Sequence, residues 1–407
     1  MRQFSKRIYF DWAASAPHID GRLSSDNNIF FANPSSKHSE GKAAKAALEK
    51  AREQCAAALN VSPENLYFTS GGTESNSIAL FSNLIRNGKG RVLASAAEHA
   101  SIREGMETLA KMGKPTGKIE VDSSGRVTVE TLEKALEKYP DTRFVSIMSV
   151  NNETGAVTDI HSLIDVIRKK TDGSAPIHFH CDLVQAAGKI PIDIKGWEID
   201  SASISAHKIG GPRGIGLLYL RRPAESFEAF YSGGGQEKGV RGGTENTMGA
   251  IALADCLSSF YNEQLTMNYE KAHSRMNKLM TALAGIERCK LIPANRTALT
   301  ASLSSHCSPL AVNCSLLTVH CFSPYILQAA FKDIPGEVMA RALDDMGFAV
   351  STGSACSSSS NERPVLAAMG VDEKLRVEGI RISQGYTTTD EDIDLLIEAI
   401  EEVLKFL

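Results

Sequence analysis

The chain has 407 residues, of which 43% are hydrophobic and 23% are charged. This composition is ordinary for a globular protein and excludes a collagen-like, coiled-coil or largely disordered chain. The formal net charge is −4, so there is no basic excess that would attract nucleic acid or anionic lipid. No apolar run reaches the ~20 residues of a membrane helix, and no signal-peptide stretch follows the basic N-terminus. We therefore expect a cytoplasmic enzyme without a nucleic acid or membrane partner.

Helical and strand patterns alternate along the first two-thirds of the chain. The helical stretches repeat apolar residues at helical spacing, and the strands are short apolar runs, β-branched or aromatic in part. This alternation predicts an α/β fold with a mostly parallel sheet covered by helices, and ligands gather at the carboxyl edge of such sheets. In chain order we expect helix 41–59, strand 65–69, a helix from Thr73, strand 91–95, helix 129–138, strand 144–150, helix 161–170 and strands 177–181, 201–205 and 216–220.

The pattern changes near residue 260, where a long helical stretch begins that is clearest over 269–283. The remainder reads as a smaller α+β unit that closes with an amphipathic helix over 390–407. Residues 290–325 are rich in Ser, Cys and His and are expected to form a loop or an insertion. The predicted division is a large domain over 15–260 and a small domain over 1–14 and 261–407.

Eight cysteines occur without a CxxC pair or a tight framework spacing. In a long chain without a secretory signal, such cysteines are expected to be reduced thiols. The His- and Cys-rich segment 306–321 could hold a metal, but its cysteines lie seven residues apart, wider than zinc sites use. We favour a variable loop there and predict no metal site. The cysteines are Cys55, Cys181, Cys256, Cys289, Cys307, Cys314, Cys321 and Cys356.

Two polar segments follow predicted strands. Lys208 ends the run Ser205–Lys208, a placement that suits a Schiff-base amine in a phosphate-bearing pocket or, alternatively, a surface lysine before a glycine turn. Asp182 ends an apolar strand, where it could cap a helix or pair with a pyridinium nitrogen.

Three further segments have both a chemical and a plain interpretation. Gly71-Gly72-Thr73 at a helix start could bind a phosphate or form a simple turn. His99, after a strand, could stack on a flat cofactor or be structural. Cys356 stands in a run of small polar residues, as an exposed nucleophile or an incidental linker cysteine.

These segments occur together in an order that resembles the cysteine desulfurases of the class V aminotransferase group, which are fold type I pyridoxal-phosphate enzymes. Each segment is weak by itself, but all of them in register are specific. The matching segments cover nearly the whole chain and are Tyr9–Pro17, Asn33–His38, Thr69–Asn76, Asn151–Gly155, Asp182–Gln185, Ser205–Lys208, Arg241–Thr244, Ser354–Cys356 and Arg381–Ser383.

The resemblance implies a fold type I transferase with a seven-stranded-type sheet in the large domain, and a small domain that carries the loop with the catalytic cysteine. It also implies a role for each matching residue. Lys208 would hold pyridoxal phosphate as a Schiff base, and Asp182 would pair with its ring nitrogen. His99 would stack on the ring and assist proton transfer as a catalytic residue. Gln185 and Asn152 would bind near the ring oxygen, and Arg381 would clamp the substrate carboxylate. The implied phosphate ligands are Gly72, Thr73, Ser205 and His207, with Thr244 from a neighbouring subunit of a homodimer.

The implied reaction takes L-cysteine to L-alanine. Lys208 would move the α-proton, and the Cys356 thiolate would attack the substrate sulfur and keep it as a persulfide for an acceptor protein. The alternatives on the same fold are a class V aminotransferase and a selenocysteine lyase, and a more distant one is a non-catalytic sulfur carrier. The presence of Cys356 argues against a plain aminotransferase, and the intact Lys208, Asp182, His99 and Arg381 argue against a non-catalytic carrier.

Overall fold

The computed structural model describes residues 6–18, 31–86, 90–170, 176–222, 229, 233–260, 263–296, 310–312, 314–317, 321–353 and 363–407. No helix in these ranges is both long enough and apolar enough to cross a membrane. The helices are α1 (Ser39–Leu59), α2 (Gly72–Arg86), α3 (Ala100–Lys111), α4 (Val129–Lys138), α5 (Ile160–Lys170), α7 (Thr247–Phe260), α8 (Glu263–Ala284), α10 (Gly336–Asp345), α11 (Pro364–Ala368), α12 (Glu373–Glu378) and α13 (Asp390–Phe406).

A seven-stranded sheet forms the centre of the larger part of the molecule, in the order β2-β8-β7-β6-β5-β3-β4. Strands β3 to β7 pair in parallel, and β8 is antiparallel to both β7 and β2. The predicted α/β fold with a mostly parallel seven-stranded sheet is therefore confirmed. The strands are β2 (Leu66–Thr69), β3 (Arg91–Ser95), β4 (Thr116–Ile119), β5 (Thr142–Ser146), β6 (His178–Asp182), β7 (Ser201–Ser205) and β8 (Gly216–Leu220).

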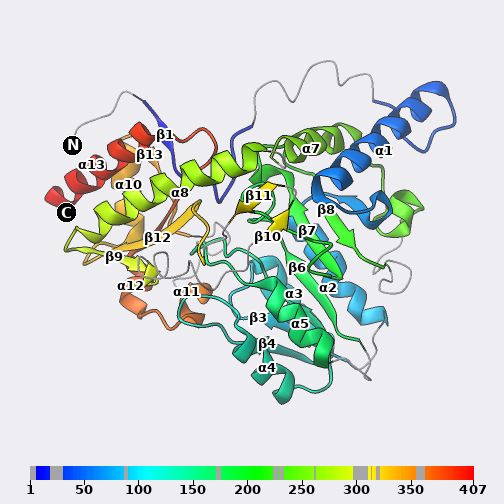
Figure 1. The fold of residues 1–407 in the computed structure, drawn as a ribbon, viewed down its shortest axis with the longest axis horizontal. Helices are drawn as coiled ribbons and strands as arrows, with labels where there is room; N and C mark the ends of the chain where they lie inside the picture. The colour runs from blue at the N-terminus through cyan, green and yellow to red at the C-terminus, as the bar shows by residue number, and fades with distance from the viewer. Residues whose placement is uncertain are drawn as a thin grey trace.

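Both faces of this sheet are covered, because alternate strand residues enter different apolar clusters. Leu93 and Val145 pack into the large cluster beneath α1, α4, α5 and α7. Their neighbours Val92 and Phe144 pack instead against α2 and α3. Figure 1 shows the helices on either side of the green and cyan strands. This two-sided burial explains why the strands read as continuous apolar runs.

The smaller part is built on a three-stranded antiparallel sheet in the order β14-β12-β9. Its own apolar cluster joins this sheet to α8, α10 and α13. The N-terminal strand β1 pairs in parallel with β13 here, so both ends of the chain lie on this side in Figure 1. We propose the division into residues 15–260 and residues 1–14 with 261–407 on these grounds. The remaining strands are β1 (Ile8–Tyr9), β9 (Cys289–Ile292), β10 (Leu310–Val312), β11 (Cys314–Leu317), β12 (Ile326–Phe331), β13 (Phe348–Ala349) and β14 (Gly379–Ser383).

Two sequence predictions are corrected here. The strand expected over 144–150 ends at Ser146, and the buried residues that follow it form irregular backbone. The segment 290–325 is not wholly irregular, because β10 and β11 form an antiparallel pair within it.

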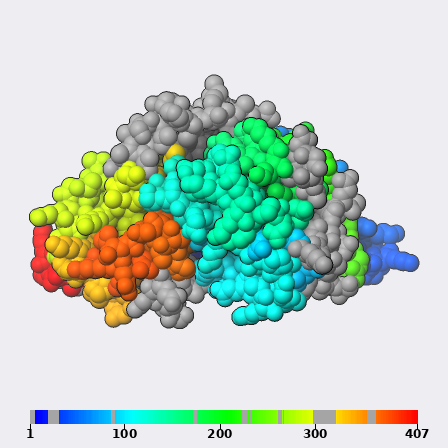
Figure 2. Space-filling view, turned by 90° about the horizontal axis from the view of Figure 1, so that it is seen from below, coloured from blue at the N-terminus to red at the C-terminus, as the bar shows by residue number. Residues whose placement is uncertain are grey.

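The two parts of the molecule pack against each other through a small apolar cluster. Ala97, which follows β3, belongs to it together with Val365, Leu366 and Met369 from α11 and its C-terminal end. In Figure 2 the orange surface of α11 and α12 accordingly borders the cyan-to-green surface of the larger part. This packing fixes the position of β14 relative to the central sheet.

A buried ion pair ties α1 to the segment that precedes α7. Arg52 and Glu237 have side chains only 5% and 1% exposed, and Arg52 Nη1 donates to Glu237 Oε2 at 2.7 Å. Breaking such a pair from one side leaves an uncompensated buried charge, at a cost of about 3–5 kcal/mol. We therefore expect Arg52→Met to lower the free energy of unfolding, measured by urea titration, by about that amount.

The control for this prediction is Glu49→Gln. Glu49 also pairs with Arg52, but its side chain is 48% exposed, so its loss should cost no more than about 1 kcal/mol. Equal losses in the two variants would contradict the importance of the buried pair.

Candidate active site

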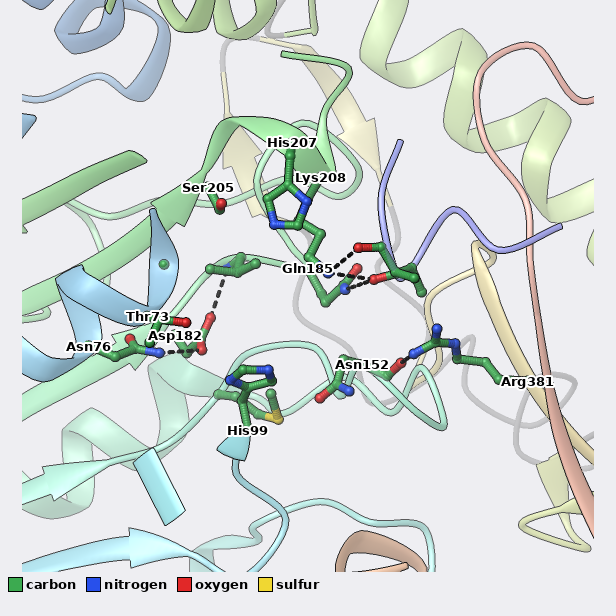
Figure 3. Close-up of a pocket in the computed structure, with 15 residues that line it drawn as sticks. Thr73, Asn76, His99, Asn152, Asp182, Gln185, Ser205, His207, Lys208 and Arg381 are labelled. Atoms are coloured by element: carbon green, nitrogen blue, oxygen red, sulfur yellow. Dashed lines mark hydrogen bonds between the residues drawn. The ribbon is translucent and has the colours of Figure 1, made fainter. Parts of the chain in front are cut away.

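A cavity of about 260 Å³ lies at the carboxyl ends of the parallel strands, where ligands bind in sheets of this kind. Figure 3 shows how its walls converge from separate elements: Asp182 and Asn76 on one side, His99 below, Asn152 and Arg381 opposite, and Lys208 above. The lining residues are Ala13, Ala14, Gly72, Thr73, Asn76, His99, Met148, Asn152, Asp182, Val184, Gln185, Ser205, His207, Lys208 and Arg381.

Asp182, at the end of β6, is a buried carboxylate that faces this cavity. Its Oδ1 accepts a hydrogen bond from the Val184 backbone N–H at 2.9 Å, and its Oδ2 accepts one from Asn76 Nδ2 at 2.8 Å. The side chain therefore caps the turn that follows β6 and also faces the cavity. Asn76 had no predicted role, although its place four residues after Gly72 on α2 puts it on the same helix face.

His99 has a structural role as well as a place in the cavity wall. It is the N-cap of α3, and its Nδ1 accepts a hydrogen bond from the Ser101 backbone N–H at 3.1 Å. Burial is the largest effect on the pKa of His99 and lowers it. Asp182 raises this pKa and Lys208 lowers it, each by a smaller amount. The ring is therefore neutral at neutral pH, with its proton on Nε2 because Nδ1 is an acceptor.

The first turn of α2 forms another wall together with the end of β7. A Cβ atom at Gly72 would lie 2.6 Å from Val184 Cγ2, so only glycine lets this turn approach so closely. Thr73 and Ser205 line the cavity beside it, as does His207, whose pKa is lowered to about 4 by burial and then by Lys208. Free backbone N–H groups at a helix N-terminus and neutral donors suit an anionic group here.

Lys208 follows β7 in the short helix η3 (Ala206–Lys208) and reaches the N-terminal segment of the chain. Its Nζ donates to the backbone oxygens of Ala13 at 2.7 Å and Ala14 at 2.9 Å. Gln185 Nε2 donates to the same Ala13 oxygen at 2.9 Å. These backbone acceptors could not be predicted from the sequence, because a backbone carbonyl group is common to every residue type.

Arg381 comes from β14 of the smaller sheet and is only 1% exposed. Its Nη1 donates to the Asn152 backbone oxygen at 3.0 Å, and its Nη2 pairs with Asp11 Oδ1 at 2.7 Å. The side-chain Oδ1 of Asn152 is buried and has no hydrogen-bond partner among the described residues. A buried amide oxygen of this kind calls for a bound group or water.

Neither Thr244 nor Cys356 is among the described residues that line the cavity. Thr244 is exposed and lies outside its lining. Cys356 lies outside the described residues, as do the side chains of Cys307 and Cys314. The other cysteines are free thiols, as expected, and burial raises the pKa of Cys55 and Cys181 and brings that of Cys289 to about 12.

Comparison with known proteins shows which family this chain belongs to. The model of the class-V aminotransferases matches residues 8–396, and the chain belongs to that family. Within it, the chain groups with the cysteine desulfurases. The cysteine desulfurase IscS of Vibrio cholerae serotype O1 is 36% identical over 407 residues, which cover 97% of this chain and 91% of that protein.

Solved structures agree with this grouping. A NifS-like protein superposes with a TM-score of 0.83 at 32% sequence identity, covering 98% of this chain and all of that one. A structure described as SspA in complex with cysteine has a TM-score of 0.73 at 27% identity, covering 94% of this chain and 100% of the other.

Proposed function

We propose that this chain is a cysteine desulfurase, which removes sulfur from L-cysteine, releases L-alanine and passes the sulfur to an acceptor protein. The observation that carries the proposal is the convergence on one cavity of Asp182 from the end of β6, Lys208 from just after β7 and Arg381 from the middle of β14. An amine, a buried carboxylate and a guanidinium in that arrangement suit the binding of pyridoxal phosphate and an amino acid together.

The residues present fit pyridoxal phosphate. The unpartnered Asn152 Oδ1 and the close approach of Gly72 leave a polar cradle beside the Asp182 carboxylate. When bound, this cofactor supplies an electron sink for negative charge at the substrate α-carbon. Lys208 would hold it covalently, with Asp182 at its ring nitrogen and His99 against its face. Its remaining ligands would be Asn152 and Gln185 near the ring oxygen, and Gly72, Thr73, Ser205 and His207 at the phosphate.

Side chains of this protein would carry out the remaining steps. Arg381 would bind the substrate carboxylate, which has to share or replace the contact that Asp11 makes with this guanidinium. Lys208 Nζ would take the α-proton and return it. Cys356 would attack the substrate sulfur as a thiolate. Of the described thiols, Cys55 and Cys181 make poor nucleophiles, because burial raises the pKa of each and disfavours its thiolate form.

The test is incubation of the purified protein with pyridoxal phosphate, L-cysteine and a thiol reductant, with assays for sulfide and alanine. Equal amounts of the two products are expected. Transfer of the amino group to a keto acid would favour a class V aminotransferase, and activity with selenocysteine alone would favour a selenocysteine lyase. A protein that yields neither product would contradict the proposal.

We also propose that the enzyme is a cytoplasmic homodimer in which Thr244 completes the phosphate site of the neighbouring subunit. Thr244 is exposed and close in sequence to Met248, whose side chain is 44% exposed. A reducing compartment keeps the thiols free. The acceptor is a protein that takes a persulfide sulfur.

Thr244→Ala is expected to weaken pyridoxal-phosphate binding by about 10- to 100-fold, the size of a hydrogen bond to a charged group. The dissociation constant is measured by titration of the visible absorbance, and the subunit number by light scattering. Thr108→Ala, at an exposed position on α3, is the control and should bind normally. A fully active monomer at assay concentration would contradict the dimer.

A further inference from the structure

Lys189 is a buried lysine behind the cavity wall. It follows Gly188, whose φ of +69° is readily adopted only by glycine and turns the chain at this point. The Lys189 side chain returns to Gln185, and its Nζ donates to Gln185 Oε1 at 2.6 Å. Gln185 lines the cavity, whereas Lys189 is not among the lining residues.

Two contacts together set which way the Gln185 amide faces. Lys189 Nζ donates to the amide oxygen, and the Ala13 backbone oxygen can only accept, so both contacts favour the same orientation of the amide. Gln185 Nε2 is thereby directed to the other side, where it donates to the Ala13 oxygen at 2.9 Å. The same oxygen accepts from Lys208 Nζ at 2.7 Å. The Ala13 carbonyl therefore links Lys208 and Gln185, and Lys189 contacts the opposite end of the Gln185 amide.

The position of Lys189 is costly for an amine. It is 8% exposed and forms none of the ion pairs found among the described residues. Burial, and then the nearby cations Lys208 and Arg381, lower the pKa of Lys189 to about 7. The hydrogen bond to Gln185 offsets part of this cost, because a buried amine without any hydrogen bond would be strongly destabilising.

We propose that Lys189 is a positioning residue, which holds the Gln185 amide with its nitrogen toward the cavity and so orients it for pyridoxal phosphate. This inference rests on the proposed function. Without Lys189 the amide oxygen would lose its donor and the Ala13 contact alone would hold the amide, so Nε2 would be less firmly oriented for donation to the ring oxygen of the cofactor. Lys189 itself touches neither cofactor nor substrate in this role.

The experiment measures the dissociation constant of pyridoxal phosphate in a double-mutant cycle of Lys189→Met and Gln185→Ala. In the wild-type background, Lys189→Met should weaken binding by about 3- to 10-fold, the size of one hydrogen bond. In the Gln185→Ala background it should cause no further change, because the residue acts through Gln185. Equal losses in both backgrounds would overturn the proposal.

Two further variants guard against a merely structural effect. Lys189→Gln keeps an N–H donor without the charge and should bind the cofactor more tightly than Lys189→Met. If both bind equally weakly, the proposal is wrong. Lys114→Met removes another buried lysine, whose Nζ donates to the Asn83 backbone oxygen, and should leave cofactor binding unchanged. A wild-type protein that binds no pyridoxal phosphate would instead refute the proposed function, so the two failures are distinguishable.

Discussion

The Lys208→Ala variant is expected to lack the visible absorption of lysine-linked pyridoxal phosphate and to lose turnover of L-cysteine. A positioned general acid or base contributes about 10²–10⁴-fold to a rate, and Lys208 would also hold the cofactor, so the loss should be at least of that size. The variant should still bind some cofactor, because the helix-terminus cradle at Gly72 and the Asp182 carboxylate remain. Absorbance spectra and alanine release measure the two effects separately.

Lys195→Ala is the matched control. Lys195 is an exposed lysine outside the cavity lining, so its loss should change neither the spectrum nor the rate. A wild-type protein that stays colourless after incubation with pyridoxal phosphate would refute the role of Lys208.

Cys356→Ser should separate cofactor chemistry from sulfur transfer. A serine hydroxyl is almost wholly protonated at neutral pH and is a much poorer nucleophile toward sulfur than a thiolate. The variant should therefore bind pyridoxal phosphate normally and still show absorbance changes when L-cysteine is added. It should release no alanine above background and carry no persulfide detectable by mass spectrometry.

The controls are single substitutions of the cysteines that we do not expect to react. Cys321→Ser is the best defined, because Cys321 Sγ accepts a hydrogen bond from Arg126 Nη1 in a buried position. Cys307→Ser and Cys314→Ser complete the set. All three should release alanine at close to the wild-type rate. A persulfide found on any of them, and not on Cys356, would contradict the assignment of Cys356 as the nucleophile.

The sequence predicted six of the seven strands of the central sheet, because short apolar runs between helical patterns have few other interpretations in an α/β chain, but it missed the edge strand β4. It was wrong after Ser146, where residues as far as Val150 are just as buried as those in the strand. Ile147 and Ser149 N–H there still donate to β6, but Met148 N–H donates to the buried carboxylate of Glu98 at 2.7 Å and not to a strand. An apolar run reports burial, and only hydrogen bonding distinguishes a strand from buried irregular backbone.

The candidate site was predictable where side chains follow strands. Asp182, Lys208 and His99 each end or follow a strand, and parallel topology brings such ends together. Their individual roles came from family resemblance and not from spacing. The Ala13 and Ala14 carbonyl groups and the Asp11 contact with Arg381 were missed, because these contacts join residues far apart in the sequence and leave no local pattern.

The pairing of the first residues of the chain with nearly the last ones has a consequence for synthesis on the ribosome. Ile8 pairs with Phe348, Asp11 with Arg381, and the Ala13 oxygen anchors Lys208. The N-terminal part emerges first and folds first, yet the cavity wall stays incomplete until β14 has left the exit tunnel. A nascent chain can therefore form its central sheet without the means to extract sulfur. The capacity to generate a reactive persulfide therefore requires that β14 has been made and has taken its place beside the N-terminal segment.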